Sequence, residues 1–320
     1  MSKVYLSAQL PEVATQQLKS AGLDVSVYEG DGLISHDELL KNVSDIDFLI
    51  TPLSTKVDKE IIDAAPKLKL IANFGAGFNN IDTAYAKEKG IPVTNTPAVS
   101  TNAVAEVTIG LMLALSHRVV EGDQKMRNEG FPGWAPLYFL GHEIAGKTLG
   151  IFGLGNIGSD VARKANALGM NVQYYKPNRL SDPEERSMKV TYKPLDELIK
   201  TSDFITINAP QTPDTLHKFD AAAFKAMKKT AYIVNVGRGP IVDEAALLDA
   251  LKSGEIAGAA LDVYEKEPKV DDGFKTLKNV ILTPHVGNAT VEARDAMANI
   301  VAGNVVLVDG GKDAKFVVNK

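Results

Sequence analysis

Three glycines between an apolar run and a helical run constrain the fold more than any other feature of this sequence. Residues 147–152 are typical of a buried strand, and residues 156–169 have the spacing of an amphipathic helix. Gly153, Gly155 and Gly158 mark the junction, and a second strand-like run follows at 171–175. This order predicts two parallel strands joined by a helix, with a glycine-rich turn at the end of the first strand.

The first hundred residues alternate between the same two kinds of run. Runs typical of buried strands occupy residues 3–8, 24–28, 47–51 and 68–74, and runs typical of helices occupy residues 11–20, 36–43, 59–66 and 81–90. Such an order favours a parallel sheet with helices on its faces, because parallel strands need a crossover connection. We therefore predict a small doubly wound, flavodoxin-like α/β domain.

A chain of 320 residues is long enough for two domains. Residues 102–130 form one long helical pattern, apolar enough to be buried on several sides, which we interpret as the connection to the second domain. Further strands are predicted at residues 171–175, 190–192, 203–209, 230–236, 256–263 and 279–285. An apolar helical pattern at 291–311 is expected to pack back on the first domain. We predict a discontinuous substrate domain of residues 1–100 and 292–320, and a Rossmann-type dinucleotide-binding domain of residues 101–291.

The glycine pattern has a specific chemical reading in this context. Gly153 permits a tight turn, Gly155 lets the backbone approach a pyrophosphate, and Gly158 allows close packing of helix on sheet. The first helical residues, Asn156 and Ile157, place backbone N–H groups at the positive end of the helix. A glycine-rich turn without a ligand is the simpler alternative, which the flanking strand and helix disfavour.

The end of the second strand departs from the usual dinucleotide pattern. A carboxylate is expected some ~20 residues after the motif, where it would bind the ribose hydroxyls. This sequence has Lys176 and Arg179 there instead. A carboxylate would repel a 2′-phosphate, whereas two cations can pair with it. The residues therefore favour NADP(H) over NAD(H), unless both cations are ordinary solvated loop residues.

Composition excludes several classes of function. The net charge of −5 and pI near 5.6 give no basic face for nucleic acid. The absence of cysteine excludes disulfides and thiolate metal sites, and we expect no metal. No apolar run is long enough to cross a bilayer, and the first residues do not resemble a signal peptide. We therefore expect a cytoplasmic protein that acts on a small molecule.

Chemically active side chains follow three neighbouring strands of the second domain. Gly237 and Arg238 follow one strand, Asp262 and Glu267 the next, and His285 the last. Ligands of doubly wound sheets bind at the carboxyl ends of strands, so these side chains should converge there. Each alone is more often structural than functional, and the prediction rests on their shared placement.

The three types suit hydride transfer to a 2-oxoacid. Arg238 can bind the carboxylate in a fork and polarise the adjacent carbonyl. His285 can donate or accept the hydroxyl proton, and Glu267 can orient the imidazole. A nicotinamide cofactor would supply the hydride itself.

Five ordered motifs resemble the D-isomer-specific 2-hydroxyacid dehydrogenase family, over nearly the whole chain. They are NFGAGFNNID at 73–82, GLGNIG at 153–158, NVGRGPIVDE at 235–244, GAALDVYEKEP at 258–268 and TPHVGNAT at 283–290. The resemblance implies reversible reduction of a 2-oxoacid to a D-2-hydroxy acid, with Arg238 on the substrate, His285 as acid/base and Glu267 supporting His285.

The resemblance implies further contacts. The turn of Gly75, Ala76 and Gly77 would offer backbone N–H groups to the substrate carboxylate, and Asp262 would contact the nicotinamide amide. A homodimer built on the cofactor domain is also implied. Lys176 stands where many members carry an aspartate. In this respect the sequence is similar to the glyoxylate/hydroxypyruvate reductases and phenyllactate dehydrogenases. The alternative is a dinucleotide-sensing, co-repressor-like protein with little turnover; the substrate could be glyoxylate, hydroxypyruvate or a bulkier acid.

Overall fold

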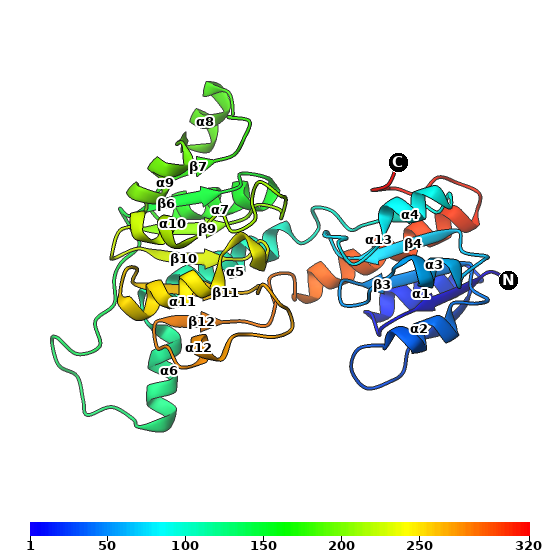
Figure 1. Cartoon of the computed structure of the whole chain (residues 1–320), viewed down its shortest axis with the longest axis horizontal. Helices are drawn as coiled ribbons and strands as arrows, with labels where there is room; N and C mark the ends of the chain where they lie inside the picture. The colour runs from blue at the N-terminus through cyan, green and yellow to red at the C-terminus, as the bar shows by residue number, and fades with distance from the viewer. The chain divides into compact units, whose positions relative to one another are not determined.

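The chain forms two compact units, each built on a parallel sheet (Figure 1). The computed structural model describes all 320 residues. Unit 1 consists of Met1–Ser100 and Thr290–Lys320, and unit 2 of Thr101–Ala289. The predicted fold class, two doubly wound α/β sheets, is confirmed.

Unit 1 contains a five-stranded sheet in which every pair of neighbours is parallel. The strand order β2-β1-β3-β4-β5 is the flavodoxin-like order. The strands are β1 (Lys3–Leu6), β2 (Asp24–Val27), β3 (Phe48–Pro52), β4 (Leu70–Phe74) and β5 (Val93–Thr94). The sequence pattern missed β5, because two residues are too few to show a period and only pairing with β4 defines them.

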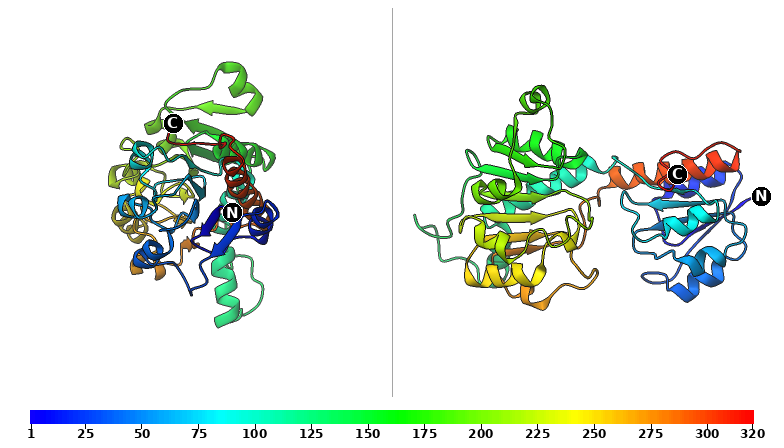
Figure 2. Two further views of the ribbon diagram at one scale, coloured as in Figure 1. Left: turned by 90° about the vertical axis from the view of Figure 1, so that its right-hand side faces the viewer. Right: turned by 45° about the horizontal axis from the view of Figure 1, so that its top comes forward.

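Helices cover both faces of this sheet, and alternate side chains of each strand serve the two layers. Val4 and Leu6 point into the core beneath two helices, while Tyr5 lies in the core on the opposite face. The first layer holds α1 (Glu12–Ser20) and α13 (Val291–Asp309); the second holds α2 (His36–Asn42), α3 (Lys59–Asp63) and α4 (Thr83–Glu88). The chain's last helix therefore completes the unit that its first residues begin, as Figure 2 shows.

Unit 2 contains a seven-stranded parallel sheet of order β12-β11-β10-β9-β6-β7-β8. Its strands are β6 (Thr148–Phe152), β7 (Asn171–Tyr175), β8 (Val190–Tyr192), β9 (Phe204–Ile207), β10 (Tyr232–Asn235), β11 (Gly258–Leu261) and β12 (Val280–Leu282). The order reverses between β6 and β9, which pair directly. Ligands of such sheets bind at the carboxyl ends of the strands near this reversal.

Two apolar cores also flank the sheet of unit 2. Leu149 and Ile151 of β6 lie in the first, whereas Ile205 and Ile207 of β9 lie in the second. The first core includes α5 (Thr101–Ser116) and α7 (Asn156–Ala167), beside α8 (Asp182–Met188); the second includes α9 (Leu195–Thr201), α10 (Ala221–Ala226), α11 (Glu244–Ser253) and α12 (Asp272–Lys275).

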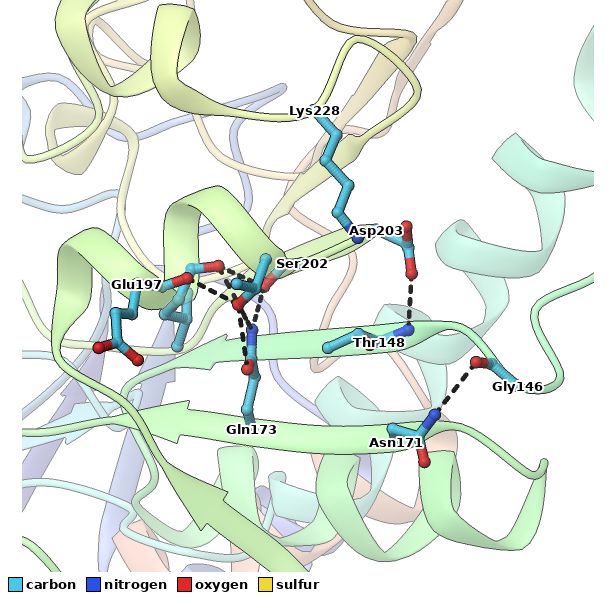
Figure 3. Close-up of polar contacts among 10 residues, drawn as sticks. Gly146, Thr148, Asn171, Gln173, Glu197, Ser202, Asp203 and Lys228 are labelled. Carbon is cyan, nitrogen blue, oxygen red and sulfur yellow. Dashed lines mark hydrogen bonds and ion pairs between the residues drawn. The ribbon is translucent and has the colours of Figure 1, made fainter.

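A polar network fixes the amino ends of the strands in unit 2 (Figure 3). The carboxylate of Asp203 accepts from the Thr148 amide and from the Lys228 ammonium, both at 2.9 Å. The buried side chain of Gln173 donates to the Ser202 hydroxyl at 2.9 Å. These buried or half-buried polar groups find partners within the fold.

The single long helix predicted at 102–130 is wrong. The structure has two helices, α5 and α6 (Val119–Asn128), bent by 61° at a break where Arg118 has a left-handed φ of 56°. The returning chain causes the break, since the His142 amide donates to the Ser116 carbonyl at 2.7 Å. The helix therefore loses an acceptor at its last turn. No single helix is long and apolar enough to cross a membrane, and this bent pair reaches that length and composition only when both parts are joined.

Candidate active and cofactor site

The glycine turn after β6 requires glycine at two of its three positions for internal reasons. Gly153 has a φ of 99°, and a Cβ there would lie 2.7 Å from the Ala209 backbone nitrogen. A Cβ on Gly158 would lie 2.2 Å from the Gly153 carbonyl oxygen. At Gly155, by contrast, an added Cβ meets nothing within 4 Å. The protein itself tolerates a side chain at Gly155, so the open space there fits a ligand that approaches the backbone.

Helix α7 begins at this turn without a side-chain cap. Gly155 is its N-cap residue, and no side chain accepts from the first backbone N–H groups, which belong to Asn156, Ile157 and Gly158. These orphan N–H groups and the helix dipole form an anion-binding end. The turn and helix therefore fit the pyrophosphate of a dinucleotide, at the strand where the sheet order reverses.

The two cations after β7 have different surroundings. Arg179 forms a two-point ion pair with Glu185, from Nε to Oε1 at 2.9 Å and from Nη2 to Oε2 at 3.0 Å. Glu185 also accepts from the Tyr174 hydroxyl at 2.8 Å, so this carboxylate is held in place. Lys176 forms no ion pair within the chain. Arg179 is therefore paired with Glu185 and Lys176 is in no ion pair; that either cation contacts a 2′-phosphate stays a prediction.

The turn after β10 carries Arg238 and is held by the buried side chain of Asn235. Its Oδ1 accepts from the Gly237 amide at 3.1 Å, and its Nδ2 donates to the Arg238 carbonyl at 3.1 Å. A Cβ on Gly237 would lie 2.9 Å from the Ala209 carbonyl oxygen, so this turn packs tightly on the segment after β9. Sequence reasoning gave Asn235 no role, although it is the first residue of the motif at 235–244.

The guanidinium of Arg238 is largely withdrawn from solvent. Burial lowers the pKa of Arg238, and the nearby carboxylate of Glu267 opposes that shift. One of its N–H groups, on Nη1, donates to the Gly237 carbonyl at 2.7 Å. An arginine keeps its charge even under such burial. The side chain is thus a fixed cation in a low-dielectric place, suited to binding an anion.

Glu267 and His285 form a hydrogen-bonded pair. His285 Nδ1 lies 3.0 Å from Glu267 Oε2, and Glu267 Oε1 accepts from the Tyr264 amide at 3.0 Å. Burial by itself would raise the pKa of Glu267, but the hydrogen bonds from His285 and Tyr264 and the charges of His285 and Arg238 lower it overall. Glu267 is therefore an anion that orients the imidazole, whose Nε2 makes no hydrogen bond within the chain. The backbone of His285 has a φ of 54°, the kind of strain that functional sites often hold.

Asp262 is 1% exposed and holds the segment that follows His285. Its carboxylate accepts from the Thr283 hydroxyl at 2.6 Å and from the amides of Val286 and Gly287, both at 2.8 Å. Three donors already occupy this carboxylate. Its contact with the nicotinamide amide stays a prediction, while the structure assigns it the positioning of the His285 segment.

The remaining predicted residues lie in unit 1, in the turn after β4. The carbonyls of this turn are all taken: Asn73 Nδ2 donates to Gly77 at 2.6 Å, Asn95 Nδ2 to Ala76 at 2.7 Å, and the Thr96 amide to Gly75 at 2.9 Å. The amides of Ala76 and Gly77 donate to nothing within the chain. Two N–H groups facing away from satisfied carbonyls can receive a carboxylate. No group of three or more His, Asp or Glu side chains in the chain is placed to hold a metal ion.

Comparison with known proteins bears on the whole arrangement. The family model for the NAD binding domain of D-isomer specific 2-hydroxyacid dehydrogenases matches residues 109–287, within unit 2. A Staphylococcus aureus (strain MRSA252) protein named as a 2-hydroxyacid dehydrogenase is 56% identical over 319 residues, covering 100% of both chains. These matches confirm the resemblance seen in the motifs.

Solved structures agree over the full length. A Thermus thermophilus protein has a TM-score of 0.94 at 36% identity, with 99% of each chain covered. The NADPH-dependent glyoxylate/hydroxypyruvate reductase of Sinorhizobium meliloti, in complex with NADP and malonate, has a TM-score of 0.83 at 32% identity, covering 99% of this chain and 96% of that one. Escherichia coli D-lactate dehydrogenase has a TM-score of 0.86 at 28% identity, covering 99% and 100%. The chain therefore belongs to the D-isomer specific 2-hydroxyacid dehydrogenase family, and is an oxidoreductase that uses a nicotinamide dinucleotide.

Proposed function

We propose that the protein reduces a 2-oxoacid to a D-2-hydroxy acid, reversibly, with Arg238, Glu267 and His285 as its catalytic set. The observation that carries the proposal is the Glu267–His285 pair, with Nδ1 and Oε2 3.0 Å apart, coupled by charge to the buried Arg238. An anion-binding cation and an oriented imidazole are the two groups that carbonyl reduction requires. The dinucleotide-sensor alternative is not favoured, since the named relatives are dehydrogenases.

Each residue has a defined task in this proposal. Arg238 binds the substrate carboxylate and polarises the neighbouring carbonyl. Glu267 accepts the Nδ1 proton of His285, so that the opposite nitrogen, Nε2, faces the substrate oxygen with the proton to be transferred. The dinucleotide supplies the hydride when it is bound. The reverse reaction uses neutral His285 as the base.

The dinucleotide is proposed to be NADP(H), chiefly on the support of Lys176. The ammonium of Lys176, directly after β7, forms no ion pair within the chain and can pair with a 2′-phosphate. Arg179 contributes indirectly, because its ion pair with Glu185 neutralises a carboxylate that would otherwise repel the phosphate. The S. meliloti enzyme that binds NADP shares this fold. Glyoxylate, hydroxypyruvate and bulkier 2-oxoacids all offer the same carboxylate and carbonyl, so the substrate class is proposed at that level.

A homodimer formed through unit 2 is proposed as the assembly. Helix α6 has no buried residue, and with the following segment it extends away from the sheet of unit 2 (Figure 1). Trp134 and Leu137 are 86% and 85% exposed. The exposed large apolar side chains of this part are Val119, Met126, Phe131, Trp134, Leu137 and Leu140. Such a group favours burial against a second copy. Sedimentation of Leu137→Glu should give a monomer; an unchanged mass would contradict this surface.

A cytoplasmic location remains a prediction from sequence.

Turnover of a 2-oxoacid panel, with NADH and NADPH in parallel, tests the reaction. We expect reduction of at least one acid, and a fall of roughly 10²–10⁴-fold in kcat for both Arg238→Ala and His285→Ala. His36→Ala, which breaks a histidine–carboxylate pair with Asp58 in unit 1, is the matched control and should behave like the wild type. Tight dinucleotide binding without turnover of any acid would instead support a sensor.

A further inference from the structure

Two glutamates outside the proposed catalytic set hold each other's backbone. The Glu244 amide donates to Glu265 Oε1 at 3.0 Å, and the Glu265 amide donates to Glu244 Oε1 at 2.8 Å. The same Glu265 Oε1 lies 3.0 Å from His217 Nε2. We call His217, Glu244 and Glu265 the loop clamp. Sequence reasoning gave these residues no role, because they come from three separate segments.

The clamp joins the segments that carry Arg238 and Glu267. Glu265 is two residues before Glu267, and Glu244 starts α11, which follows Arg238 after the single 3₁₀ turn Gly239–Ile241. At Gly239 the two segments touch backbone to backbone, since a Cβ there would lie 1.9 Å from the Tyr264 carbonyl carbon. A backbone contact with no side chain between the two segments does little to fix their orientation relative to each other. The reciprocal hydrogen bonds of Glu244 and Glu265 supply that restraint.

His217 adds a third segment, residues 209–217, to the same junction. At its start, Ala209 lies against both Gly153 of the cofactor turn and Gly237 beside Arg238. At its end, the His217 amide donates to the Pro240 carbonyl at 2.8 Å, in a left-handed conformation with φ of 46°. Within it, the Thr215 hydroxyl donates to the Pro210 carbonyl at 2.9 Å. This segment therefore connects the proposed dinucleotide turn to Glu265.

The clamp brings two carboxylates together. Burial raises the pKa of Glu244, the hydrogen bond from the Glu265 amide opposes the shift, and the charge of Glu265 adds to it. No arginine or lysine forms an ion pair with either carboxylate, and His217 is the group that pairs with Glu265. Like charges held together are unfavourable for folding alone.

We propose that His217, Glu244 and Glu265 are positioning residues that set the placement of Glu267 relative to Arg238 and to the dinucleotide turn. The inference rests on the proposed roles of Arg238 and Glu267, and goes beyond them by adding groups that touch neither substrate nor cofactor. Small displacements of a catalytic group lower turnover more than they lower binding.

The test compares Glu265→Ala with Glu265→Gln, and His217→Ala with His217→Gln. The glutamine at 265 keeps an oxygen for the Glu244 amide, and the glutamine at 217 keeps a donor for Glu265. We expect Glu265→Ala to lower kcat by roughly 10–100-fold and His217→Ala by about 3–10-fold, each with less than about a threefold change in dinucleotide Kd. Each glutamine variant should recover most of the loss. His36→Ala again serves as the control.

The outcomes are separable. If the wild type turns over and Glu265→Ala matches it in kcat, the clamp has no positioning role and the proposed reaction stands. If each glutamine variant is as impaired as its alanine partner, hydrogen-bond positioning is also refuted. If the wild type reduces no 2-oxoacid, or Arg238→Ala remains fully active, the proposed function itself fails.

Discussion

The two units each end a buried parallel strand in a glycine-containing turn, but the turns are made differently. In unit 2, the turn Gly153–Gly158 leads at once into the twelve residues of α7. In unit 1, the turn Gly75–Gly77 leads into no helix until Thr83, and side-chain amides of Asn73 and Asn95 hold its carbonyls instead.

The two turns differ in how many backbone N–H groups they leave without a partner, and we propose that each receives an anion. The helix of unit 2 gathers several N–H groups and a dipole, which suits a diphosphate spread over a helix end. The unit 1 turn offers only the amides of Ala76 and Gly77, which suits a single carboxylate. The helix is part of the fold, whereas the unit 1 turn depends on individual side chains. Substitutions should therefore act differently at the two turns.

The largest effect is expected at Gly155. Its Cβ would meet no protein atom, so Gly155→Ala should fold normally yet weaken dinucleotide binding by roughly 100-fold, because the added methyl occupies the approach of the pyrophosphate. Fluorescence titration with NADPH measures this loss. Gly153→Ala is the contrasting variant, since its positive φ and its contact with Ala209 should instead lower the melting temperature of the protein. If Gly155→Ala binds NADPH as tightly as the wild type does, the dinucleotide does not bind at this turn.

The next effect separates the unit 1 turn from the cofactor. Asn73→Ala should raise the KM for a 2-oxoacid by roughly tenfold and leave dinucleotide Kd unchanged, because the Gly77 carbonyl loses its donor and the Gly75 carbonyl keeps only the Thr96 amide. Steady-state kinetics on the wild type and variant give both values. Asn279→Ala, which removes an amide bond to the Ala257 carbonyl, controls for general destabilisation. A change in dinucleotide Kd with constant KM would reverse the assignment of the two turns.

An effect of the same size concerns which dinucleotide unit 2 prefers. Lys176→Asp should shift the ratio of kcat/KM values for NADPH and NADH toward NADH by about tenfold, since it exchanges a phosphate partner for a repelling charge. Lys189→Asp makes the same charge change at an exposed position of unit 2 and should leave the ratio near that of the wild type. A wild type that already prefers NADH by a wide margin would contradict the interpretation of Lys176.

The smallest effect is a pH dependence confined to unit 2. The pKa of Glu267 is lowered in the folded state, so its stabilising contribution is complete above its unfolded value of about 4.5 and is lost as pH falls through the folded value. The difference in melting temperature between wild type and Glu267→Gln should therefore shrink by about 1 °C from pH 6 to pH 3.5. Asn73→Ala removes no titratable group, and its melting temperature should keep a constant offset. If the difference in melting temperature between wild type and Glu267→Gln grows as the pH falls, the pKa of Glu267 is not lowered by folding.

Particular residues show how far sequence reasoning reached. Continuous apolar runs and helical patterns predicted both sheets, because the strands of a parallel sheet are buried on both faces. The strand ends then predicted Arg238, Glu267 and His285 as a group, and the structure pairs the last two. The break at Arg118 was missed because the returning segment at His142 causes it, and no local pattern encodes a distant partner. The same reason hid His217 and the Glu244–Glu265 pair, whose segments are brought together only by the fold. Asn235 lies in the motif at 235–244, but its hydrogen bonds to Gly237 and Arg238 depend on the folded turn.

Local sequence patterns were enough to predict which residue types end each strand, which turns contain glycine, and that a dinucleotide fits the turn after β6. Those features are local, since a period, a turn or a helix start is set within a few residues. The folded structure was needed to show that Arg179 pairs with Glu185 and that Asp262 accepts hydrogen bonds from three donors. It was also needed to show that two glutamates join the Arg238 and Glu267 segments. These contacts depend on side-chain placement in the folded chain: Glu185 is 6 residues from Arg179, whereas Val286 and Gly287 are 24 and 25 residues from Asp262. No short sequence pattern specifies which of several polar groups a side chain will contact.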